Sequence, residues 1–72
     1  MNIPIKLLDV VALTQDLPGE ELYRGQVGTV VEILAPDVYE VEFIDDQGQT
    51  YATKAVNAFQ LMVLRYNLMN AA

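Results

Sequence analysis

The stretch VGTVVEILAPDVYEVEFI, residues 27–44, holds two short apolar runs on either side of a turn. Residues 27–34 and 38–44 are rich in β-branched side chains and bounded by turn residues, which is typical of strands. Between them, Pro36 presets the φ angle that the second position of a tight turn requires, and Asp37 can hydrogen-bond to its own backbone. The stretch therefore predicts a β-hairpin at the centre of the fold.

The alternation of side chains assigns the two faces of this hairpin. In residues 38–44 the apolar residues Tyr39, Val41 and Phe43 alternate with Glu40 and Glu42, so we expect the apolar set inside and both carboxylates in water. The same alternation, applied to residues 27–34 with Glu32 outside, predicts four inward residues: Val27, Thr29, Val31 and Ile33. It also predicts that Val30 and Leu34 point outward.

Three further strands are expected outside the hairpin, at residues 9–13, 49–54 and 61–64. Residues 14–24 form a long polar loop with a Pro18-Gly19 turn, and residues 45–48 form a second hairpin loop with Gly48 at positive φ. Residues 55–60 lose the period of two and predict one helical or 3-10 turn. The tail, residues 66–72, fits either a short helix or a mobile end.

Five short strands in one small chain predict an all-β fold, a small SH3-like five-stranded open barrel. Closing the sheet buries one face and protects most strand edges, which suits so short a chain. We expect a single domain over residues 1–72, with its core in residues 7–65.

The glycines at the start of the hairpin raise the question of an anion site, because Arg24 precedes Gly25 and Gly28. A phosphate-binding loop requires further glycines or a terminal Lys-Ser/Thr, and a helix after the loop. Neither is present here, and a strand follows. We therefore interpret four residues as structural turn positions: Gly25, Gly28, Pro36 and Gly48.

Composition limits the classes of function. The 72 residues include no Cys, His or Ser, so the usual nucleophiles and the usual general base are absent, and we expect no enzyme, cofactor or metal site. The net charge of −6 repels nucleic acid. No apolar run is long enough to span a membrane and no secretory signal is recognisable, so a cytoplasmic location is expected.

The outer face of the hairpin is the best candidate for a binding surface. It is expected to present three carboxylates beside two aliphatic side chains: Glu32, Glu40, Glu42, Val30 and Leu34. One interpretation is a solvated face that keeps the protein soluble. The other is a docking surface whose apolar residues contact a protein partner while the carboxylates select a basic one.

Two alternatives stay open. Arg24 with Tyr23 beside the glycine-bounded loop fits weak RNA binding, and only Tyr23 and Tyr66 are expected to be surface aromatics, because Tyr39 belongs to the core set and Tyr51 fits an inward position. The hydrophobic segment 61–64 with its tail fits a homodimer interface instead.

Several blocks of the sequence together resemble a family of small bacterial proteins, the domain of unknown function 4926. The resemblance covers roughly residues 5–65 and is carried by LDVVAL (8–13), DLP (16–18), RGQVGTVV (24–31), YEVEF (39–43), TYA (50–52) and QL (60–61). It implies a stand-alone domain without known catalytic activity, encoded beside another small protein, as in an immunity or antitoxin-type pair.

The block that begins at Gly25 is more distantly similar to two other groups, KOW elements and the SH3-like domain of the nitrile hydratase β subunit. KOW elements bind RNA through basic residues that this chain lacks. Only a fold is implied by this second similarity.

Overall fold

The computed structural model describes residues 4–64, which form an all-β domain. It contains five strands and two short 3-10 helices, in the order β1 (Val10–Leu13), η1 (Pro18–Glu20), β2 (Val27–Ala35), β3 (Val38–Ile44), β4 (Thr50–Asn57), η2 (Ala58–Gln60) and β5 (Leu61–Val63). All five strands occur where the sequence predicts them, and η2 precedes the last strand as expected.

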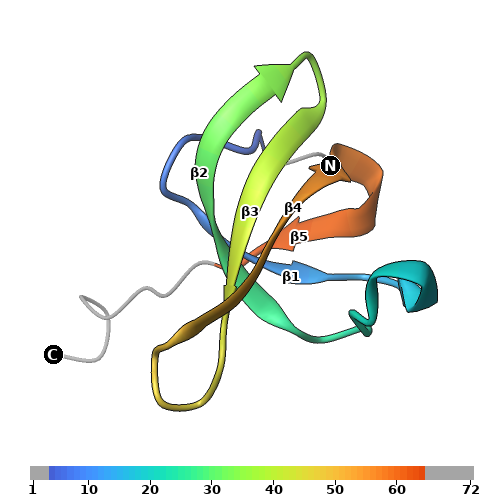
Figure 1. Ribbon diagram of the computed structural model, residues 1–72. Helices are drawn as coiled ribbons and strands as arrows, with labels where there is room; N and C mark the ends of the chain where they lie inside the picture. The colour runs from blue at the N-terminus through green and yellow to red at the C-terminus, as the bar shows by residue number, and fades with distance from the viewer. Residues whose placement is uncertain (1–3, 65–72) are drawn as a thin grey trace, which may run out of the picture.

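All strands are antiparallel and belong to one sheet in the order β4-β3-β2-β1-β5. The last strand therefore returns to pair with the first, and the sheet curls around a common interior (Figure 1). Within residues 4–64, β4 and β5 are not paired with each other, so hydrogen bonds do not close the barrel. The predicted five-stranded open barrel is confirmed.

Tight turns join β2 to β3 and β3 to β4. Pro36 and Asp37 connect β2 to β3, and Asp37 adopts a positive φ of 63°. The turn from β3 to β4 contains Gly48 at φ 78°, and the Asp45 carboxylate accepts hydrogen bonds from the backbone N–H groups of Gln47 and Gln49, each at 2.9 Å. The carboxylate of Asp45 thus has a structural role in the turn.

The helical turn is shorter than expected. β4 continues to Asn57, so only residues 58–60 form the helical turn that was expected over 55–60. Val56 lies opposite Tyr39 in the ladder and is buried. Its exposed neighbour Ala55 is apolar, so the sequence does not show the alternation of polar and apolar residues that would identify this part of the strand. The polar loop also contributes to the core, because Leu17 and Leu22 form an isolated bridge and Leu22 is buried.

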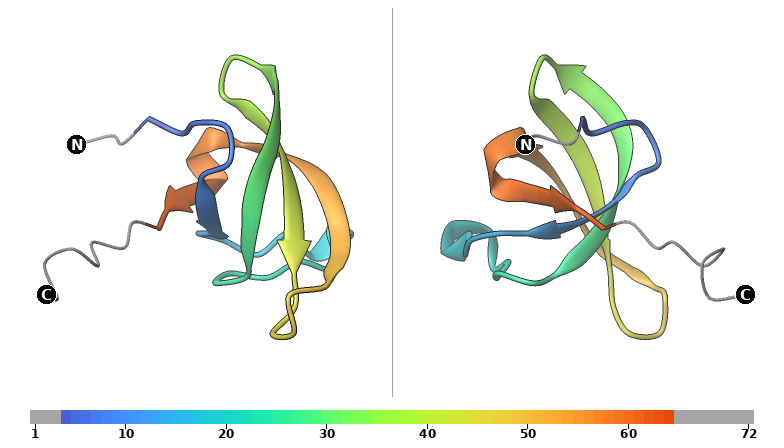
Figure 2. Two further views of the ribbon diagram at one scale, coloured as in Figure 1. Left: turned by 90° about the vertical axis from the view of Figure 1, so that its left-hand side faces the viewer. Right: turned by 180° about the vertical axis from the view of Figure 1, so that it is seen from behind.

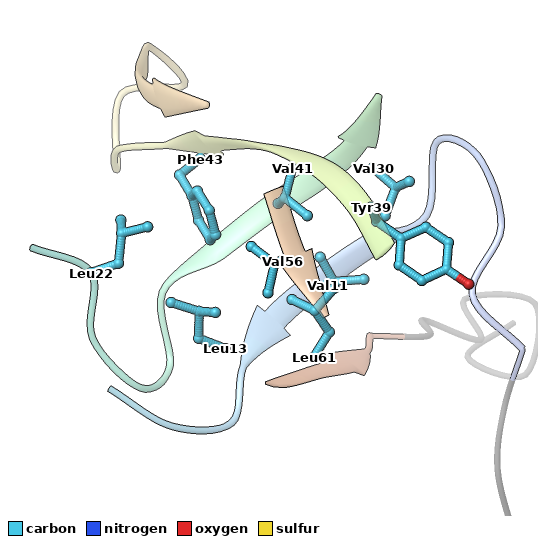
Figure 3. Close-up of a cluster of buried hydrophobic side chains, with 9 residues drawn as sticks. All are labelled: Val11, Leu13, Leu22, Val30, Tyr39, Val41, Phe43, Val56 and Leu61. Carbon is cyan, nitrogen blue, oxygen red and sulfur yellow. The ribbon is translucent and has the colours of Figure 1, made fainter. Parts of the chain in front are cut away.

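The interior of the curled sheet is filled by one hydrophobic cluster (Figure 3). Its buried members come from every strand and from the first loop: Val11, Leu13, Leu22, Val30, Tyr39, Val41, Phe43, Val56 and Leu61. The inward set expected for β3 is therefore confirmed. No buried side-chain polar atom lacks a hydrogen-bond partner among the described residues.

The two glycines that introduce β2 have different structural roles. Gly25 has φ 92°, as predicted, with no atom close to the place where a Cβ would lie. At Gly28 an added Cβ would come within 2.6 Å of Val41 Cγ1 and 2.7 Å of the Glu42 carbonyl oxygen. Gly25 is required by backbone conformation, and Gly28 by the close approach of β3.

Candidate functional site

The acidic face of the β2–β3 hairpin is the surface on which the sequence places a partner site. Glu40 and Glu42 alternate with the buried residues of β3 and lie on its outer side, half-buried. Glu32 of β2 is exposed and lies directly opposite Glu40 in the ladder. The structure therefore brings the three predicted glutamates together on one face.

A β-bulge in β2 changes which of its residues share this face. Val30 is paired with Val41, and the next pair is Glu32 with Glu40, so Val31 is an extra residue in β2. A second register shift, between Ile33 and Ala35, makes Leu34 an extra residue in the same way. If side-chain direction alternated without interruption, Val30, two residues before Glu32, would point to the outer side of the sheet as Glu32 does. The bulge reverses the alternation, so Val30 points inward with Val41.

The expectation that Val30 belongs to the partner surface is therefore wrong, because its side chain is 0% exposed. Val31 is 38% exposed instead of inward, and Ile33, which pairs with the buried Tyr39, is also exposed. Thr29 lies opposite Glu42 and hence on the outer side as well. Val30 and Val31 are both aliphatic, so alternation alone does not show which of them points inward.

The aliphatic part of the acidic face differs from the expected one. Leu34 is 45% exposed, as predicted for an outward residue. The turn before β1 lies next to β2: Leu8 is 69% exposed and donates its backbone N–H to the Val30 carbonyl oxygen at 2.7 Å, beside the bulge. Sequence reasoning missed Leu8, whose positive φ of 72° is unusual for leucine.

The three glutamates form no ion pair within residues 4–64. The ion pair that the described residues do form joins Lys54 Nζ to Glu20 Oε2 at 2.9 Å, from β4 to η1. The hydrogen bond and the charge of Glu20 raise the pKa of Lys54 above its ordinary value of 10.5. Because Lys54 lies opposite the inward Val41, this cation is on the other side of β4 from the glutamates.

The residues considered for RNA binding lie at the start of β2. Tyr23 and Arg24 are both exposed, as expected for the aromatic residue. The Arg24 backbone N–H donates to Asp16 Oδ1 at 2.9 Å, which keeps a carboxylate next to this loop. Tyr51 and Phe59 are also exposed, contrary to the expectation for Tyr51, and Tyr66 lies outside the described residues.

The proposed homodimer segment is only partly accessible. Leu61 is buried in the core and Met62 is exposed, while the tail expected to accompany them lies outside the described residues. Two other features were searched for across residues 4–64. No group of three or more acidic, His or Cys side chains is placed to hold a metal ion, and no helix is long and apolar enough to cross a membrane.

Comparison with known proteins gives one result. No curated protein and no solved structure matches the chain. The model of one protein family, described as a domain of unknown function (DUF4926), matches residues 7–63. The match extends from the turn before β1 to the last residue of β5, and so includes every strand of the sheet. The chain therefore belongs to the DUF4926 family.

Proposed function

We propose that the protein is a non-enzymatic binding module whose acidic hairpin face recognises a basic protein. The observation that carries the proposal is the placement of Glu32, Glu40 and Glu42 together beside exposed aliphatic side chains, with no cation of the described chain paired to them. Apolar contact supplies affinity in such an interface, and complementary charge selects the partner and accelerates association.

The exposed aliphatic residues distinguish this face from a surface that only aids solubility. Val31 and Leu34, which precede and follow Glu32 in β2, are exposed, although charged or small polar residues would serve solubility better. The directly opposed pair Glu32–Glu40 also disfavours the folded hairpin. A cationic partner would relieve this repulsion on binding.

The most concrete version of the proposal is a two-protein system inside a bacterial cell. The partner would be a basic protein encoded beside this one, in an immunity or antitoxin-type pair or another complex. This version rests on what the resemblance to the family implies about neighbouring genes, while the basic character of the partner rests on the acidic face.

The test compares two variants with equal net charge. Glu32→Lys/Glu40→Lys reverses the charge of the face, and Glu21→Lys/Asp46→Lys makes the same change at two exposed positions elsewhere. Each chain is used to capture proteins from the source cells, and the association rate of the captured protein is then measured at two salt concentrations. We expect wild type and the control to retain a basic protein that the face variant loses or binds more slowly.

Equal capture and equal association rates for the two variants would remove the face from the proposal. Retention of RNA by wild-type protein in filter binding at low salt would favour the alternative at Tyr23 and Arg24. A partner lost only in the control variant would place the site on another surface.

A further inference from the structure

β4 is the terminal strand of the sheet, and one side of its backbone is available for pairing. It is eight residues long and pairs with β3 on one side only. In the left-hand view of Figure 2, β4 runs along the outer border of the molecule. Within residues 4–64, residues 50–56 make no backbone–backbone hydrogen bond beyond the ladder with β3.

The direction of the free backbone groups follows from the hydrogen bonds at the end of this ladder. The N–H of Ala58 donates to the Asp37 carbonyl oxygen at 2.8 Å, so the backbone N–H and C=O groups of Ala58 point toward the β3 side. The direction of the backbone N–H and C=O groups alternates from one residue to the next along an antiparallel strand, so those of residues 56, 54 and 52 also point toward β3. The N–H and C=O groups of Thr53 and Ala55 consequently point to the free edge.

The same two residues separate that edge from the glutamates. Thr53 lies opposite Glu42 and Ala55 lies opposite Glu40, all on the outer side of the sheet. Both side chains are small, and both residues are exposed. A strand added at the edge would lie about 4.8 Å beyond β4, so a long lysine or arginine side chain could extend over Ala55 toward Glu40.

The register shift of β4 lies at Tyr51, and from Ala52 to Asn57 the strand pairs with β3 in regular register. The strand contains no proline, and its single charged residue, Lys54, lies on the inner side with its ammonium group bound to Glu20. A negative face therefore adjoins a backbone edge that is regular and free of proline at Thr53 and Ala55. That combination favours a positively charged segment in extended conformation.

We propose that the basic partner binds by strand addition: an extended segment with lysine or arginine at alternate positions pairs with the free edge of β4 at Thr53 and Ala55. Main-chain hydrogen bonds supply affinity in this mode, and side chains at every second position supply specificity. Alternate residues of a strand are about 6.8 Å apart, the same spacing as that between Glu40 and Glu42, so successive cations match successive carboxylates. This inference rests on the proposed function and adds the mode of recognition.

The test uses a nine-residue synthetic peptide of alternating lysine and threonine, blocked at both ends. Amide hydrogen exchange of the folded protein is followed by NMR with the peptide and with a control peptide in which glutamate replaces lysine. We expect the lysine peptide alone to slow exchange at the Thr53 and Ala55 amides by about tenfold or more, because those groups become hydrogen-bonded.

A variant gives an independent readout of the same contact. Ala55→Pro removes the edge-facing N–H, and proline is tolerated at an edge when its missing donor faces solvent. We expect peptide binding to weaken at least about tenfold with the fold retained. The wild-type exchange measurement decides the matter if this variant does not fold.

Each other outcome has a distinct meaning. Chemical-shift changes at Glu40 and Glu42 without protection at Thr53 and Ala55 would overturn strand addition and leave the acidic face as a docking surface. No binding of the lysine peptide at low salt would overturn strand addition, and the capture experiment would then decide the proposed function alone. Protection that is present without peptide and grows with protein concentration would assign the edge to a second copy and overturn the inference.

Discussion

Glu32 and Glu40 lie directly opposite each other on the outer side of β2 and β3, one step from the buried pair Val30–Val41. The extra residue Val31 separates the two pairs. The bulge therefore brings like charges together at the position where it also exposes an aliphatic side chain. Opposed carboxylates lower the stability of the hairpin, so this face is not optimised for folding alone.

Replacing one of the opposed carboxylates with a cation should stabilise the protein. Glu40→Lys converts the repulsive pair with Glu32 into an attractive one, and we expect the free energy of unfolding to rise by about 0.2–1 kcal/mol. Urea denaturation measures the change. Asp46→Lys is the control, because it alters the net charge equally in an exposed loop. An equal gain in the control would mean that only net charge matters.

The bulge predicts that truncation of Val30 destabilises the protein much more than truncation of the adjacent Val31. Val30→Ala removes two buried methyl groups and leaves a cavity, so it should cost about 2 kcal/mol. Val31→Ala acts on a partly exposed side chain and should stay within about 0.5 kcal/mol. Chemical denaturation of both variants tests the expectation. A larger loss of unfolding free energy for Val31→Ala than for Val30→Ala would indicate that Val31 points inward, and would contradict the bulge.

The comparison of these valines also indicates what the sequence can predict. Alternation in β3 correctly assigns Tyr39, Val41 and Phe43 to the core, because the two residues that separate them, Glu40 and Glu42, are charged. In β2 the adjacent residues Val30 and Val31 are both aliphatic, so the side-chain pattern does not show which of the two points inward. The ladder with β3 determines it.

Contacts between distant segments were beyond sequence reasoning for a similar reason. Leu22 lies in a stretch with the composition of a polar loop, yet the curled sheet covers it and it joins the core. The backbone of Leu8 reaches the Val30 carbonyl oxygen because the chain turns there at positive φ. Both placements depend on the closure of the sheet and on backbone conformations that local composition does not specify.

Gly28 should be the least replaceable of the glycines that adopt ordinary φ angles. In Gly28→Ala the new Cβ would meet Val41 Cγ1 at 2.6 Å and the backbone oxygen of Glu42 at 2.7 Å, so β3 would have to shift. We expect a loss of about 1–3 kcal/mol in the free energy of unfolding. Gly19→Ala is the matched control, with no atom within 4 Å of the new group. Backbone entropy alone should stabilise both variants slightly, because alanine restricts the unfolded chain. A similar loss in both variants would therefore show that the close approach of β3 is not responsible.

The ion pair between Lys54 and Glu20 predicts a dependence of stability on alkaline pH. Glu20 raises the pKa of Lys54 in the folded protein above the ordinary value of 10.5 that applies to the unfolded chain. The stability that this shift contributes is therefore fully present below pH 10.5 and is lost as the pH rises through the raised pKa. Since both side chains are largely exposed, the contribution is small and weakened by salt.

Thermal melting from roughly pH 9 to pH 11.5, at low salt, measures this contribution. The melting temperature of wild type should decrease more over this pH range than that of Lys54→Met, because the variant has no ammonium group at this position to deprotonate. Lys6→Met is the control for the removal of one exposed lysine, and it should behave as wild type does. Glu20→Gln should reproduce the effect of Lys54→Met, since either change breaks the same pair. If Lys6→Met reduced the alkaline loss as much as Lys54→Met, the dependence would come from net charge and not from the contact between β4 and η1.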